Sequence, residues 1–182
     1  MRSRFKPLPL AAVVATALVA VLGGCDGHRG PASDGPLGGG AYGSISGGSV
    51  CAPARVGQPR TFGIERLTNH GHVGIVLDDV SLLKPHNEHL IGSYAVPGHF
   101  LIGVVTWPPN YSGIPSAWKD RRPVHGFRLG PGKTFIMVLG VVATKKGRAT
   151  SQGMATYYHD SAGSFVLKSH LAMIIAVDKS AC

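Results

Sequence analysis

Acidic side chains are scarce in this sequence: 182 residues carry 9 Asp and Glu against 18 Lys and Arg. The adjacent pair Asp78 and Asp79 falls on an expected strand, where alternation sends the two carboxylates to opposite faces. A G-x-S-x-G nucleophile motif is also missing. These shortages exclude the simplest hydrolytic sites, which need paired carboxylates or an activated nucleophile. We expect no enzymatic activity and no cofactor; the alternative is a serine or histidine enzyme whose site is assembled from residues scattered along the sequence.

Long hydrophobic runs are limited to one, at residues 8–22, which follows the basic residues Arg2, Arg4 and Lys6. A permanent membrane-spanning helix needs about 20 apolar residues, and this run is shorter. A basic start, a short apolar segment and small residues after it are typical of an export signal. The sequence therefore predicts a cleaved signal peptide rather than a spanning anchor.

The residues that end this segment are Leu22, Gly23, Gly24 and Cys25. They resemble the lipobox of bacterial lipoproteins, in which the cysteine thiol is lipidated and the chain is cleaved just before it. The resemblance implies that residues 1–24 are removed and that Cys25 carries a diacylglyceryl thioether and a further acyl chain such as palmitate. Several acyl chains make a stable anchor. The resemblance implies that membrane lipid is a partner and that the protein lies on the extracytoplasmic face of the cell membrane. The alternative is an ordinary signal-peptidase site beside a chance cysteine.

Residues 25–50 continue with nine glycines and almost no large apolar side chains. Such a segment cannot bury enough surface to offset its ordering entropy, so we expect a flexible tether. The remaining 51–182 are long enough for one hydrophobic core.

Cysteine is the next scarce residue, since only Cys51 and Cys182 remain once Cys25 is assigned to lipid. An even number of cysteines in an oxidising compartment favours a disulfide. The alternative is two free thiols near the ends of the domain.

Helical periodicity is absent from residues 51–182, whereas alternating apolar residues and Gly, Pro or Asn turns recur about every ten residues. This pattern predicts an all-β sandwich of about seven to nine strands. The segment 134–142 is apolar on both faces, as in a central strand. The expected strands are 61–68, 72–82, 89–96, 99–106, 124–129, 133–143, 152–159 and 164–177, the last long enough to divide in two.

Three segments resemble bacterial immunoglobulin-like surface modules: IERLTNHGHVGIVLDDVSL (64–82), LGPGKTFIMVLGVV (129–142) and GMATYYHDSAGSFVL (153–167). The combination is also similar to small secreted proteins of actinobacteria with no assigned activity. The resemblance implies an immunoglobulin-like antiparallel β-sandwich and by itself implies no function.

Histidine is plentiful, with nine in the chain. A copper or zinc site could use His70, His72, His159 and His170, because neutral imidazole suits both metals. A site needs three or four converging ligands, and surface histidines in turns are the commoner case. We keep metal handling as the alternative function.

Basic residues give the remaining hint about partners. Without residues 1–24 the net charge is +6, and basic clusters occur at 119–122 (KDRR) and 145–148 (KKGR). Outside the cytoplasm this favours an anionic cell-wall polymer, or an envelope protein, over nucleic acid. The expected function is a non-enzymatic binding or structural module of the cell envelope. The alternative is that the two basic clusters are ordinary solvated charges in loops.

An aromatic loop completes the set of candidate binding residues. Trp107, Tyr111 and Trp118 lie among prolines between two expected strands. They could form an exposed recognition patch, or they could fold back and cover the sandwich. The second arrangement is the commoner use of tryptophan in a small domain.

Overall fold

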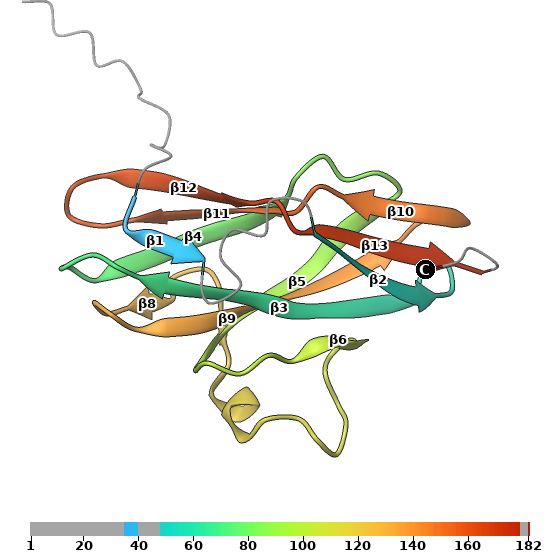
Figure 1. The fold of residues 1–182 in the computed structure, drawn as a ribbon, viewed down its shortest axis with the longest axis horizontal. Coiled ribbons are helices and arrows are strands. Elements are labelled where there is room, and N and C mark those ends of the chain that lie inside the picture. The colour runs from blue at the N-terminus through green and yellow to red at the C-terminus, as the bar shows by residue number, and fades with distance from the viewer. Residues whose placement is uncertain (1–34, 40–47, 179–181) are drawn as a thin grey trace, which may run out of the picture.

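The computed structural model describes residues 35–39, 48–178 and 182 (Figure 1). Cys25 and the expected signal peptide lie outside the described residues, so lipidation stays a prediction. The strands are β1 (Leu37–Gly39), β2 (Ser49–Ala54), β3 (Pro59–Asn69), β4 (Ile75–Leu82), β5 (Glu88–Pro97), β6 (Gly103–Thr106), β7 (Arg122–Pro123), β8 (Arg128–Leu129), β9 (Thr134–Ala143), β10 (Gly147–Ser151), β11 (Met154–His159), β12 (Ser164–Ser169) and β13 (Ala172–Val177). One short 3-10 helix, η1, spans Ser116–Asp120. In the described part of the chain, no helix is long and apolar enough to cross a membrane.

The strands form two layers. One layer is a six-stranded sheet in the order β1-β3-β9-β5-β7, with β6 also paired to β3. The other contains a four-stranded sheet, β12-β11-β4-β8, and a three-stranded sheet, β10-β13-β2, which lie over different parts of the first layer (Figure 1). All pairings are antiparallel except that of β13 with β2. The expected all-β sandwich of mainly antiparallel strands is confirmed.

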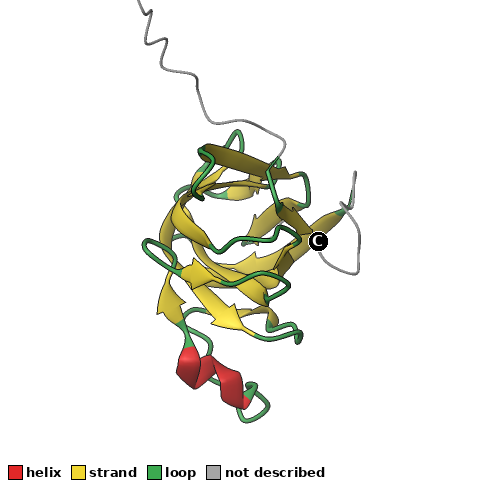
Figure 2. Cartoon of the chain, turned by 90° about the vertical axis from the view of Figure 1, so that its left-hand side faces the viewer, coloured by secondary structure: helices red, strands yellow, loops and turns green. Residues whose placement is uncertain are grey.

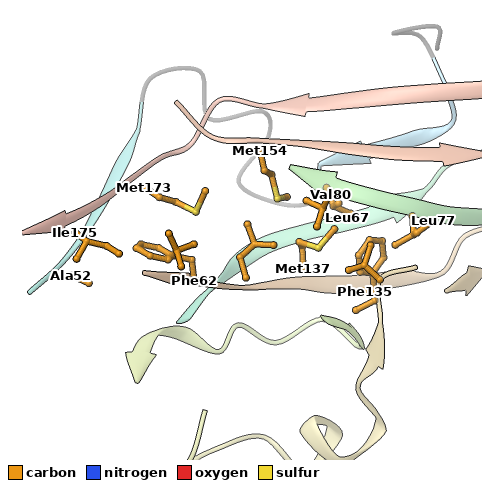
Figure 3. Packing of buried hydrophobic residues seen from close by; sticks show 14 of the residues in the cluster. Ala52, Phe62, Leu67, Leu77, Val80, Phe135, Met137, Met154, Met173 and Ile175 are labelled. Atoms are coloured by element: carbon orange, nitrogen blue, oxygen red, sulfur yellow. The ribbon is translucent and has the colours of Figure 1, made fainter. Parts of the chain in front are cut away.

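Strand β9 lies between β3 and β5 and is buried along its whole length. Its inward residues, including Phe135, Met137 and Leu139, belong to the main core between the layers (Figure 3). Its outward residues Ile136 and Val138 belong to a second apolar cluster on the outer face of the sheet. The prediction of a central strand that is apolar on both faces is therefore confirmed, and the outer face needs a cover.

Two expected strands are much shorter in the structure. The segment 124–129 is a turn followed by the two-residue strand β8, because Gly126 adopts a positive φ of 78° that a strand cannot continue through. Of the expected strand 99–106 only Gly103–Thr106 forms a strand, β6. The segment 164–177 divides into β12 and β13, as its length suggested, and these two strands join different sheets. The structure has thirteen strands in the described residues rather than seven to nine, because β1, β2, β7 and β10 lie outside the expected strands. β1, β7 and β10 have at most one large apolar side chain each, and β2 contains Pro53, so none of the four shows a clear strand pattern.

Parts of the expected tether 25–50 belong to the domain. Leu37–Gly39 forms β1, an edge strand of the six-stranded sheet that pairs with β3, and Leu37 is only 3% exposed in the main core. Ser49 begins β2. The expected start of the domain at residue 51 is therefore wrong, because residues 37–39 and 49–50 already form strands of it. Burial of Leu37 and strand pairing hold Leu37–Gly39 on the sheet.

The disulfide between Cys51 and Cys182 is present, with an S–S distance of 2.05 Å and Cα atoms 5.5 Å apart. It joins β2 to the residue at the end of the sequence, 131 positions away. The pairing expected from the number of cysteines is confirmed.

Candidate anion-binding site

Two turns at one end of the sandwich position the candidate site. In the first, the Phe127 amide bonds to the Val124 carbonyl, and this turn is fastened to β4 by Leu77 N–H to Phe127 O and Gly126 N–H to Leu77 O, at 2.9 and 2.8 Å. His125 Nδ1 adds a contact of 2.7 Å to the Asp78 carbonyl. The turn is thus held rigidly beside the sheet.

Asn69 organises the second turn. Its buried side-chain amide donates to the carbonyls of Val73 and Leu129 at 2.8 and 3.2 Å, while its Oδ1 accepts from Gly71. Its backbone exchanges bonds with Gly132 and Lys133. The Asn-His-Gly and Pro-Gly turns seen in the sequence therefore brace one another through one buried side chain.

Between these turns lie two adjoining hollows, which share Phe127 and Arg128 and which we call the basic groove. The larger, about 460 Å³, is lined by Pro97, Gly98, His99, Phe127, Arg128, Leu129, Gly130, Gly132, Lys133 and Thr134. The smaller, about 340 Å³, is lined by Arg122, Pro123, His125, Gly126, Phe127 and Arg128. No carboxylate lines either hollow.

The charge of the basic groove is not neutralised by neighbours. Arg122, Arg128 and Lys133 are exposed and make no ion pair in the described part of the chain. The nearby Asp78 carboxylate already has a hydrogen-bond partner, because its Oδ1 lies 2.7 Å from His159 Nδ1. Arg66 adds positive charge at the edge, because its Nη1 donates to the His99 carbonyl at 3.3 Å. The groove offers several unpaired cations in a concave surface, which suits an anionic ligand.

The two basic clusters of the sequence take different positions. KDRR (119–122) reaches the groove through Arg122 in β7. KKGR (145–148) begins beyond the last residue of β9, whereas the groove meets the first residue, Thr134. Ten strand residues span about 30 Å, so the clusters mark opposite ends of the sandwich.

The aromatic loop covers the outer face of the six-stranded sheet. Trp107 lies on Gly92 and Gly140, which are register partners on β5 and β9. A Cβ at Gly140 would lie 2.5 Å from the indole, and one at Gly92 would lie 2.8 Å from it, so only glycine leaves room for this ring. The indole seals the second apolar cluster.

Other aromatic residues complete this cover. Tyr94 stacks on Trp107 and meets Trp118 edge-on, both with ring centroids 5.7 Å apart. The Arg121 guanidinium lies 4.8 Å above the Trp118 ring. Tyr111 is 37% exposed and donates its hydroxyl hydrogen to a backbone carbonyl. Figure 2 shows η1, which contains Trp118, outside the strands. Because both indoles pack against the second apolar cluster, the two tryptophans cover the sheet rather than form an open patch.

The four histidines of the metal hypothesis are not brought together. His70, His72 and His170 are exposed, and His159 is paired with Asp78. Across 35–39, 48–178 and 182, no three His, Cys, Asp or Glu side chains form a group that could hold a metal ion. Alternation along separate hairpins leaves each histidine with too few neighbours of its kind.

One buried carboxylate lies away from the groove. Glu88 is 7% exposed, and neither its carboxylate oxygens nor the Ser151 hydroxyl reaches hydrogen-bond geometry with a partner. Burial raises the pKa of Glu88 to about 7, and the Ser151 side chain offsets part of the rise. Nothing in the sequence pattern marked this residue.

Sequence reasoning found Arg122 but missed the rest of the groove. The sequence did predict a Pro-Gly turn beside Lys133 and a strand that contains Arg128. That these two segments lie close together depends on the hydrogen bonds of Asn69 and Leu77, which no local pattern predicts.

No protein-family model and no curated protein matches the chain. Among solved structures, it is similar to the ASH/PapD-like domain of human CEP192 (PapD-like domain 7), with 10% identity, a TM-score of 0.40, and coverage of 95% of this chain and 100% of that one.

Proposed function

We propose that this protein is a lipid-anchored envelope lipoprotein whose sandwich binds an anionic cell-wall polymer in the basic groove and catalyses no reaction. The observation that carries the proposal is the groove itself, with Arg122, Arg128 and Lys133 unpaired and no carboxylate in its lining. A polymer with a regular series of phosphodiester or carboxylate groups would meet several of these cations at once.

The rigid turns support binding. The groove is held by backbone hydrogen bonds and by the buried Asn69, so its backbone needs little ordering when a ligand arrives.

The groove is tested with the double variant Arg128→Gln, Lys133→Gln. We expect the full chain, purified in detergent, to cosediment with isolated cell walls, and the variant to bind about tenfold more weakly. Each exposed charge contributes about 0.5–1 kcal/mol, and 1.4 kcal/mol is a factor of ten. Raising the salt concentration should release the wild-type protein, because exposed charges are screened.

The matched control is Lys145→Gln, Lys146→Gln, which removes the same charge at the far end of β9. Its affinity should stay within twofold of wild type. Equal losses in both variants would mean unspecific attraction to the wall, and full binding by the groove variant would exclude the groove. Binding to walls from which the phosphodiester polymer has been removed distinguishes the two kinds of anion: binding is lost if phosphate groups are the ligand and is kept if the remaining carboxylates are.

Membrane anchoring through Cys25 rests on the lipobox resemblance of residues 22–25. We expect Cys25→Ala, expressed in the host, to move from the membrane fraction to the soluble extracytoplasmic fraction, because each buried acyl methylene contributes about 0.8 kcal/mol to attachment. Cys25→Ala that stays in the membrane fraction would contradict the proposal. The groove double variant, which keeps Cys25, should remain anchored.

A further inference from the structure

A small cavity of about 10 Å³ lies between the two layers, away from the basic groove. It is lined by Phe62, Ile64, Glu65, Met137, Leu139, Met154, Ser169, Leu171 and Met173. Ile64, Glu65, Ser169 and Leu171 are half-buried, which places the opening where the chain passes from β12 to β13. The volume is close to the minimum that admits one water-sized particle.

A β-bulge brings Glu65 to this cavity. The pairing of β3 with β9 runs from Phe62↔Leu139 to Glu65↔Met137, so β3 carries one extra residue. Residues three apart on a regular strand point to opposite faces, yet Phe62 and Glu65 both line the cavity. The bulge therefore turns a carboxylate toward the core, a use of bulges that is common beside functional sites.

Three methionines from three strands line the same cavity as this carboxylate. Met137 in β9, Met154 in β11 and Met173 in β13 are each at most 4% exposed, and they are all the methionines that the structure describes. Figure 3 shows their side chains in the space between the layers. The cavity thus has three neutral thioethers and one carboxylate, and no cationic side chain lines it.

Glu65 is the one charged side chain in the lining of this cavity. It is half-buried among apolar side chains, with the Ser169 hydroxyl as its polar neighbour and no cationic side chain in the lining. A carboxylate in apolar surroundings is stabilised further by a positive partner. A partner that enters from the opening would have to be small and monovalent to leave the cavity neutral.

We propose that Met137, Met154, Met173 and Glu65 bind one Cu(I) ion in this cavity. Thioether sulfur is a soft ligand that selects Cu(I), whereas zinc takes thiolate, imidazole and carboxylate ligands. One carboxylate balances the single charge of the ion. Methionine has three rotatable bonds, so the sulfur atoms can adjust to the ion without movement of the strands.

The experiment is a Cu(I) titration of the full chain carrying Cys25→Ser, which removes the one cysteine thiol outside the disulfide. Bicinchoninate competes for the ion under ascorbate, in detergent. We expect one equivalent of Cu(I) to be withdrawn from the chelator. Met154→Leu with Met173→Leu should weaken binding at least tenfold, and its folding should be retained because leucine and methionine have similar volumes. Glu65→Gln should also weaken it.

His70→Ala with His72→Ala is the matched control, and it should bind Cu(I) as tightly as the parent protein. X-ray absorption at the copper edge of the parent complex should show sulfur neighbours near 2.3 Å, about the length of metal–sulfur bonds in proteins. The proposal is overturned if the folded parent withdraws no copper, if copper is surrounded by nitrogen and oxygen alone, or if the histidine variant loses binding while the methionine variant keeps it. The absorption measurement decides the matter even if the methionine variant fails to fold.

Discussion

The paired substitution Cys51→Ala, Cys182→Ala is expected to lower the free energy of unfolding by about 4 to 5 kcal/mol, the largest change that we predict for this domain. The disulfide closes a loop across 131 positions, and its removal returns that loop-closure entropy to the unfolded chain. Urea unfolding of the full chain, followed by tryptophan fluorescence, measures the difference.

The wild-type protein in reducing buffer should unfold at the same urea concentration as the paired variant. The slope against urea should increase in both, because an unfolded chain without the crosslink exposes more surface. A loss below about 1 kcal/mol would contradict the expectation and would mean that the unfolded chain is already compact.

Glu88→Gln is expected to change how stability depends on pH. The raised pKa means that the folded protein keeps a proton on Glu88 up to pH 7, whereas the unfolded chain releases it near the ordinary value of 4.5. Wild-type stability therefore falls as the pH rises from 4.5 to 7, by about 3 kcal/mol at 1.36 kcal/mol per pH unit. Below pH 4 this residue is protonated in both states and contributes no slope.

Urea unfolding at pH 4 and pH 8 tests this expectation. Between these values the stability of Glu88→Gln relative to wild type should shift by about 3 kcal/mol in favour of the variant, since glutamine never carries the buried charge. Glu65→Gln serves as a comparison, because the pKa of Glu65 is raised as well. If Glu88→Gln keeps the full wild-type slope, the charge is relieved by another group in the folded protein.

The fold class could be predicted because local patterns carry it. Strand β9 shows apolar residues on both faces, and the turn after Asn69 has the residues that its geometry needs. The short strands were missed for the opposite reason: β10 has the sequence GRATS, whose pairing with β13 comes from its neighbour and not from its own composition.

The candidate sites depend on contacts that no local pattern contains. The basic groove needs Arg128 and Lys133 to meet across the Asn69 and Leu77 hydrogen bonds. The methionine cavity depends on one extra residue in β3, which changes the face of Glu65. The sequence predicts in part that Trp107 covers the sheet, because a proline-rich aromatic loop favours that arrangement. The position of its ring on Gly92 and Gly140 depends on strand register, which the sequence does not show.

The Cys51–Cys182 bond also makes the domain a covalent ring. A protease that cuts once at an exposed turn between these residues, for example after Lys145, leaves the two pieces joined by the disulfide instead of releasing a fragment. The two new ends remain on one molecule, and the strands on both sides of the cut stay paired with their neighbours. Wherever peptidases reach the protein, such a nicked molecule would keep the groove and the cavity together.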